Sequence, residues 1–126
     1  MPINIAINGF GRMGRLTFRH VFDDPKVEVV AINSRGSAAF YAHLLKYDSS
    51  YGTWDKTVEA PDDNHIVVDG KSIKLMREKE DPANLPWDEL EVDVVVESTG
   101  VFKNKKDTSK HIEAGAKRVL VTTSIP

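Results

Sequence analysis

The stretch that decides the fold comprises residues 3–14, with the sequence INIAINGFGRMG. Isoleucine occupies every second position at its start, at Ile3, Ile5 and Ile7, and this alternation predicts a short buried strand. The strand runs into the spacing G-x-G-x-x-G at residues 9–14, where apolar residues begin to recur with helical periodicity. A strand, a glycine turn and a helix in this order are the context in which that spacing indicates a loop that holds a pyrophosphate.

Each glycine of the loop has an expected role. Gly9 permits the tight turn, Gly11 lets the backbone approach a pyrophosphate with no Cβ in the way, and Gly14 allows the helix to pack closely on the strand. The backbone N–H groups at the helix start, around Arg12 and Met13, then face the anion along the helix dipole. The competing interpretation is a glycine-rich turn that binds no ligand.

The residues after the loop predict a βαβ unit. Apolar positions with helical spacing define one face of the expected helix. That face consists of Met13, Leu16, Thr17, His20 and Val21. Pro25 ends the helix, because proline supplies no N–H for the next turn. Residues 27–32 are too apolar for a half-exposed strand, which is typical of a parallel strand covered on both faces.

Further elements continue the alternation of strands and helices. We expect a helix over residues 38–46, an aromatic loop over 47–58, a hairpin over 66–76 that turns at Asp69 and Gly70, a strand over 92–97, a helix over 105–114 capped by Gly115, and a last strand over 119–121. The order predicts an α/β fold: a Rossmann-like, doubly wound, largely parallel sheet with a small β-hairpin insertion. Residues 1–126 would form one dinucleotide-binding domain that is incomplete, because such folds usually have two βαβαβ halves.

Composition excludes several classes of protein. Lys and Arg total 17 against 19 Asp and Glu, for a net charge of −2, which gives no reason to expect nucleic acid or an anionic membrane as a partner. The chain has no cysteine, so it holds no disulfide, thiolate metal site or thiol nucleophile. No apolar run is long enough to cross a bilayer, and no export signal is evident, so we expect a soluble cytoplasmic protein.

The end of the second strand bears on the choice of cofactor. A carboxylate normally accepts the ribose 2′-hydroxyl of NAD at this point, but the sequence has Asn33, Ser34 and Arg35. No carboxylate repels a 2′-phosphate here, and the Arg35 guanidinium suits one. The sequence therefore allows NAD or NADP, with a slight preference for NADP. The alternative is a turn whose Arg35 side chain faces solvent.

Four ordered blocks resemble phosphorylating glyceraldehyde-3-phosphate dehydrogenase. They are IAINGFGRMGR at residues 5–15, AHLLKYDS at 42–49, VVESTGVF at 95–102 and KHIEAGAKRV at 110–119. The resemblance covers essentially the whole chain. It implies an NAD(P)-binding domain of a homotetrameric enzyme, with residues 45–48 near a subunit interface.

The resemblance also implies which residues bind the cofactor. Those expected at the pyrophosphate are Asn8, Gly9, Gly11, Arg12 and Met13. Asn33 and Ser34 would lie at the adenosine ribose, although Ser34 replaces the aspartate usual in NAD-specific members. Those expected toward the nicotinamide are Ser98, Thr99, Gly100, Phe102 and Thr122.

Catalysis is not expected from this chain alone. In the family, the nucleophilic cysteine, the histidine base and the substrate-phosphate residues come later in the sequence. We therefore predict no catalytic residue, expect His43 and His111 to be packed or surface residues, and predict that Asp62, Asp63 and His65 form a solvated loop rather than a metal site. Two alternatives stay open: a freestanding dinucleotide-binding module without catalysis, and the corresponding half of erythrose-4-phosphate dehydrogenase.

Overall fold

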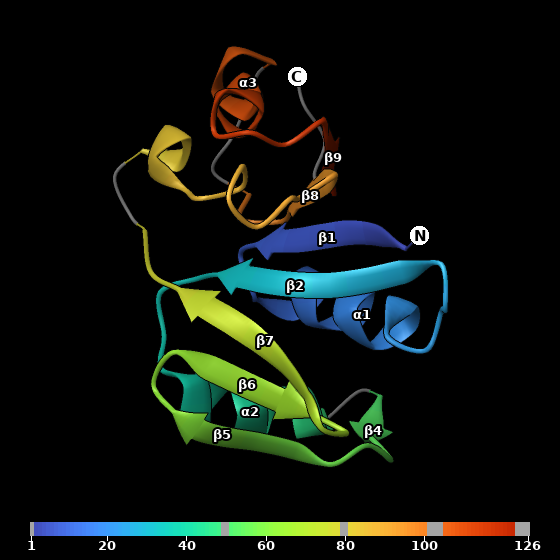
Figure 1. Cartoon of the computed structure of the whole chain (residues 1–126). Coiled ribbons are helices and arrows are strands. Elements are labelled where there is room, and N and C mark those ends of the chain that lie inside the picture. The colour runs from blue at the N-terminus through green and yellow to red at the C-terminus, as the bar shows by residue number, and fades with distance from the viewer. Residues whose placement is uncertain (1, 49–50, 79–80, 101–104, 123–126) are drawn as a thin grey trace.

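The fold is built on a seven-stranded sheet with the strand order β5-β6-β7-β2-β1-β8-β9 (Figure 1). The computed structural model describes residues 2–48, 51–78, 81–100 and 105–122, with the backbone alone for residues 105 and 107. The elements are β1 (Ile3–Asn8), α1 (Arg12–Val21), β2 (Val27–Asn33), α2 (Ala38–Lys46), β3 (Tyr47–Asp48), β4 (Gly52–Thr53), β5 (Val58–Asp62), β6 (His65–Val68), β7 (Lys71–Met76), the 3-10 helix η1 (Pro82–Asn84), β8 (Val94–Glu97), α3 (Lys105–Glu113) and β9 (Arg118–Val121).

Strand pairing confirms the predicted fold class. The pairs β2–β1, β1–β8, β8–β9 and β2–β7 are all parallel, whereas β5–β6 and β6–β7 are antiparallel. The predicted hairpin turn is confirmed as well: Asp69 and Gly70 have φ angles of 48° and 82°, as a type I′ turn requires.

The prediction of a loop over residues 47–58 was wrong in part. Strands β3 and β4 form a separate two-stranded ladder there, and β5 begins at Val58 to extend the hairpin to three strands. Two-residue strands carry no periodicity. Strand β5 has the sequence VEAPD, and its Pro61 and acidic residues mark a sheet edge rather than a buried strand.

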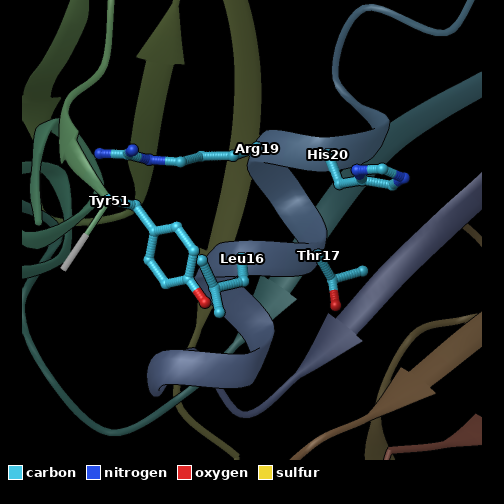
Figure 2. A pocket seen from close by; sticks show the side chains of 5 residues that line it. All are labelled: Leu16, Thr17, Arg19, His20 and Tyr51. Carbon is cyan, nitrogen blue, oxygen red and sulfur yellow. The ribbon is translucent and has the colours of Figure 1, made fainter.

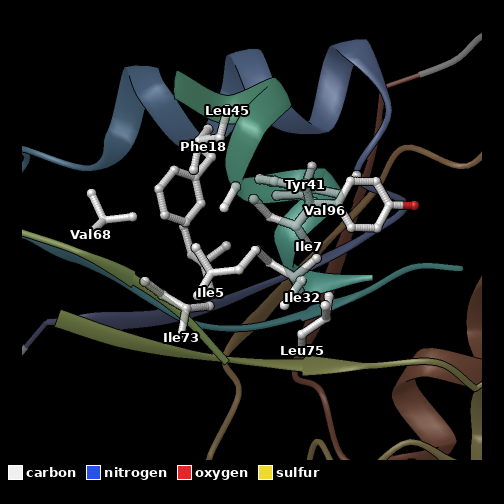
Figure 3. Packing of buried hydrophobic residues seen from close by; sticks show 14 residues of the cluster. Ile5, Ile7, Phe18, Ile32, Tyr41, Leu45, Val68, Ile73, Leu75 and Val96 are labelled. Carbon is white, nitrogen blue, oxygen red and sulfur yellow. The ribbon is translucent and has the colours of Figure 1, made fainter. Parts of the chain in front are cut away.

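Apolar residues cover both faces of the sheet. Successive side chains of β1 point to opposite faces, so Ile5 and Ile7 join one cluster while Ala6 joins the other. The first cluster packs α1 and α2 on the sheet (Figure 3), and includes Phe10, Phe18, Ile32, Tyr41, Leu45, Leu75 and Val96. The second lies on the opposite face, and consists of Ala6, Ala31, Leu85, Trp87, Val92, Val95, Ala114 and Ala116.

The predicted buried face of α1 was wrong. Met13 is 48% exposed and His20 is exposed, while the buried residues of α1 are Gly14 and Phe18. Phe18 places its ring edge-on to Phe10 and Trp54, with centroid distances of 5.8 and 5.9 Å. An aromatic cluster from three segments therefore decides which side of α1 faces the sheet, and the apolar spacing of Met13 and its neighbours does not.

No helix within the described ranges is long and apolar enough to cross a membrane.

Candidate functional site

The site lies at the carboxyl ends of the parallel strands. Asn8, Asn33 and Glu97 are the last residues of β1, β2 and β8, and Asn8 stands opposite both of the others in the strand register. From β1 the chain passes through α1 to β2 on one side, while β8 pairs with the other side of β1. Open α/β sheets bind ligands at such a switch point, outside the carboxyl ends of the strands.

The glycine loop has the geometry that its sequence predicts. Gly9 has a φ of +93°, which favours glycine, and a Cβ at this position would lie 2.8 Å from the backbone nitrogen of Thr99. A Cβ on Gly14 would lie only 2.2 Å from the carbonyl oxygen of Gly9. A Cβ on Gly11, by contrast, would meet no atom of the described residues within 4 Å. Gly11 therefore borders open space, whereas the other two glycines border protein.

The N-terminus of α1 is left open toward that space. Gly11 is its N-cap residue and has no side chain to accept a hydrogen bond, and the first turn contains no acidic residue. The partial positive charge of the helix end is thus uncompensated within α1 itself. Arg15 Nη1 donates to the Phe10 carbonyl oxygen at 3.0 Å and so holds the loop from the helix side.

Glu97 is the centre of a buried polar network behind the loop. Its Oε1 accepts from Asn8 Nδ2 at 2.6 Å and from His111 Nε2 at 2.8 Å. Its Oε2 accepts from the backbone nitrogen of Thr99 at 2.9 Å and from the Thr99 hydroxyl. One carboxylate at the end of β8 is therefore bonded to the end of β1 and to α3. It is also bonded to Thr99, the residue that packs on Gly9.

The charge states follow from the partners. Trp87 Nε1 can only donate, and it lies 3.0 Å from His111 Nδ1, so Nδ1 accepts and Nε2 carries the proton given to Glu97. His111 is therefore a neutral imidazole. Burial by itself raises the pKa of Glu97, but the hydrogen bonds from His111, Thr99 and Asn8 outweigh it and hold that pKa below its usual value.

The network extends along the strand ends to β2 and β7. Asn33 Nδ2 donates to Asn8 Oδ1 at 2.8 Å and to the Glu78 carbonyl oxygen at 3.1 Å, and Asn33 Oδ1 accepts from the Glu78 backbone nitrogen at 2.8 Å. Glu97, His111 and Trp87 are parts of the site that no sequence motif predicted. The sequence did carry one indication of this network, because three buried strands each end in a polar residue.

Ser34 follows Asn33 and faces the glycine loop. Its Oγ accepts from the Phe10 backbone nitrogen at 3.1 Å and lies 2.7 Å from the Tyr41 hydroxyl. The Tyr41 hydroxyl also accepts from the Gly36 backbone nitrogen at 3.1 Å. Arg35 is exposed.

The remaining predicted residues lie along the same edge. Ser98 Oγ donates to the Gly9 carbonyl oxygen at 2.6 Å, and Gly100 follows in a left-handed conformation with a φ of 77°. Thr122 lies just after β9, where its backbone nitrogen donates to the Glu97 carbonyl oxygen at 3.0 Å. Arg12 and Met13 are exposed at the start of α1. Phe102 lies outside the described residues.

One further feature lies away from this edge of the sheet. An open groove beside α1 is lined by Leu16, Thr17, Arg19, His20 and Tyr51 (Figure 2). This groove contains none of the predicted binding residues. Within it, Arg19 already donates to backbone carbonyl oxygens, among them that of Leu45 at 2.8 Å.

The two other predictions about titratable residues concern His43 and the segment from Asp62 to His65. His43 is exposed, with its ring centroid 5.1 Å from that of Tyr47. Among the described residues no group of three or more His, Asp or Glu side chains could hold a metal, and His65 Nδ1 pairs with Asp62 at 3.0 Å.

A largely parallel sheet covered on both faces, with a glycine loop after its first strand and an open helix end beside it, defines the Rossmann-type class of α/β domains. The sequence model of one family, the glyceraldehyde 3-phosphate dehydrogenase NAD binding domain, matches residues 3–105. The chain therefore belongs to this family.

Individual relatives agree with the family assignment. The chain is 50% identical over 122 residues to glyceraldehyde-3-phosphate dehydrogenase of Salmonella typhimurium and to glyceraldehyde-3-phosphate dehydrogenase A of Escherichia coli K12. Each of these alignments covers 97% of this chain and 36% of the relative. It is 48% identical over 122 residues to glyceraldehyde-3-phosphate dehydrogenase 2 of Bacillus subtilis, covering 35% of that protein. The chain thus spans about a third of the length of these relatives.

Proposed function

We propose that residues 1–126 form an NAD(P)-binding domain, the cofactor-binding part of a phosphorylating glyceraldehyde-3-phosphate dehydrogenase. The observation that carries the proposal is the open space at Gly11 beside the uncapped end of α1. A pyrophosphate there would accept the N–H groups of Arg12 and Met13 and lie against the positive end of the helix dipole. The complete enzyme would oxidise glyceraldehyde 3-phosphate to 1,3-bisphosphoglycerate, with NAD(P) as hydride acceptor. This chain alone would bind cofactor without catalysis.

The rest of the cofactor would follow the carboxyl edge of the sheet. We propose that Asn8 and Gly9 complete the pyrophosphate loop, and that Asn33, Ser34 and Arg35 lie at the adenosine ribose. The residues proposed to lie toward the nicotinamide are Ser98, Thr99, Gly100, Phe102 and Thr122. We propose further that the complete protein acts in the cytoplasm as a homotetramer.

Two glycine substitutions test the site. Gly11→Ala should weaken NAD(P) binding by about tenfold or more, because the new Cβ would occupy the space proposed for the phosphates. Its effect on the free energy of unfolding should stay below about 1 kcal/mol, since that Cβ meets no described atom. Isothermal titration calorimetry and urea unfolding measure the two quantities.

Gly14→Ala is the matched control. Its Cβ would lie 2.2 Å from a backbone oxygen, so this variant should lose about 2 kcal/mol or more of stability. If Gly11→Ala binds cofactor as tightly as the parent chain, the phosphates do not lie at this loop and the proposed site is wrong.

The preference for NADP has its own test. Arg35 is exposed beside Ser34 and would attract a 2′-phosphate. Arg35→Ala should therefore weaken NADP binding by about three- to tenfold while NAD binding changes little. Titration with both cofactors measures the ratio, and an unchanged ratio would refute a role for Arg35.

A further inference from the structure

We infer that Tyr41 fixes the direction in which the Ser34 hydroxyl can form hydrogen bonds, so that Ser34 is a donor toward the 2′ position of the adenosine ribose. Tyr41 then acts as a positioning residue for cofactor choice from a place in the core. The inference rests on the proposed function, because it supposes that a dinucleotide lies against Ser34.

The hydroxyl oxygens of Ser34 and Tyr41 each accept one hydrogen bond from the backbone. The Phe10 backbone nitrogen donates to Ser34 Oγ at 3.1 Å, and the Gly36 backbone nitrogen donates to the Tyr41 hydroxyl at 3.1 Å. The two hydroxyl oxygens lie 2.7 Å apart, so one proton is shared between them. Whichever group receives this proton keeps its own for another partner.

The chemistry of the two hydroxyls decides the direction of that bond. Tyr41 is 8% exposed, and its ring packs edge-on against Phe10 with a centroid distance of 5.6 Å. Ser34 is half-buried at the carboxyl edge of the sheet. Within the described part of the chain, neither hydroxyl has a further hydrogen-bond partner. The two hydroxyls share one part-buried place. A phenolic hydroxyl is more acidic than an aliphatic one and is therefore the better donor, so Tyr41 donates and Ser34 keeps its proton.

As a consequence, Ser34 Oγ can donate a hydrogen bond to a ligand but cannot accept one. Phe10 and Tyr41 occupy the lone pairs of Ser34 Oγ, so a ribose 2′-hydroxyl cannot donate to it as it would to a carboxylate. The free Ser34 proton can still bond to an acceptor, and an anionic phosphate oxygen is the strongest one available at the 2′ position. The arrangement therefore favours NADP over NAD independently of Arg35.

The test is Tyr41→Phe, which keeps the buried ring and removes the hydroxyl. The ratio of the NAD to the NADP dissociation constant, measured by calorimetry on the 126-residue chain, should fall about three- to tenfold, because a lone pair of Ser34 is freed to accept. In a Ser34→Ala background the same substitution should leave the ratio unchanged. Tyr47→Phe, at an exposed tyrosine of the same segment, is the control and should not alter the ratio.

The possible outcomes distinguish a failure of the role inferred for Tyr41 from a failure of the proposed cofactor binding. If both cofactors bind and Tyr41→Phe leaves the ratio unchanged, the inference is overturned while the proposed function stands. If neither cofactor binds the parent chain, the proposed function fails, and the inference fails with it. Should Tyr41→Phe not fold, the Raman doublet of Tyr41 in a Tyr47→Phe, Tyr51→Phe chain decides the matter: a donating hydroxyl supports the inference and a purely accepting one overturns it.

Discussion

At the scale of single residues, the site depends on one ionised carboxylate that does not face the ligand space. Glu97 is 1% exposed, and its two oxygens accept from Asn8, His111 and Thr99. Thr99 in turn packs on Gly9, where a Cβ would lie only 2.8 Å from the Thr99 backbone nitrogen. The shape of the glycine loop is therefore determined partly by a residue behind it.

Replacing Glu97 with glutamine should be costly. Glutamine keeps a single acceptor oxygen and turns an NH₂ group toward N–H or O–H donors, so about 3 kcal/mol of stability should be lost at neutral pH. Urea unfolding of Glu97→Gln measures the loss. A loss below about 1 kcal/mol would show that the network adds little to the fold.

The same carboxylate gives a pH dependence of defined sign. The pKa of Glu97 lies below its ordinary value of 4.5 in the folded chain, so between these two values the unfolded state binds more protons. The contribution of Glu97 is complete above about pH 4.5 and is lost as the pH falls through the lower, folded-state pKa. Asp62, Asp69 and Asp93 also have lowered pKa values, so the difference between the parent chain and Glu97→Gln isolates this residue. That difference should shrink at acid pH, and a constant difference would contradict the assignment.

At the scale of elements, local patterns predicted some features and not others. The bounds of α2 and the Asp69–Gly70 turn follow from short-range chemistry, and the structure has both where the sequence predicts them. The orientation of α1 does not, because Phe18 packs edge-on against Trp54, which comes from a distant segment of the chain. Contacts of that kind are absent from any window of the sequence.

The orientation of α1 can be measured directly. Phe18→Ala should cost about 3 to 5 kcal/mol, because its ring is 0% exposed. Met13→Ala on the opposite side should cost less than about 1 kcal/mol, since Met13 is 48% exposed. Chemical denaturation of both variants provides the comparison. A larger loss of stability for Met13→Ala than for Phe18→Ala would instead support the buried face of α1 that the periodicity predicts.

At the scale of the whole molecule, the parallel strands gather the site from segments far apart in the sequence. Asn8, Asn33 and Glu97 are brought side by side by strand register, with α3 supplying His111 from the face that also holds Trp87. The glycine spacing and the family blocks predicted a glycine loop after the first strand, and the structure has it there. They did not predict the Glu97 network, because its hydrogen bonds join residues up to 89 positions apart.

The central claim is that NAD(P) lies along this carboxyl edge, and amide NMR shifts on titration with cofactor test it most directly. We expect the largest changes at residues 9–13, at Ser34 and at residues 98–100, around the open space beside Gly11. Shifts confined to the groove residues Leu16, His20 and Tyr51, or no shifts at millimolar NAD and NADP, would contradict the account.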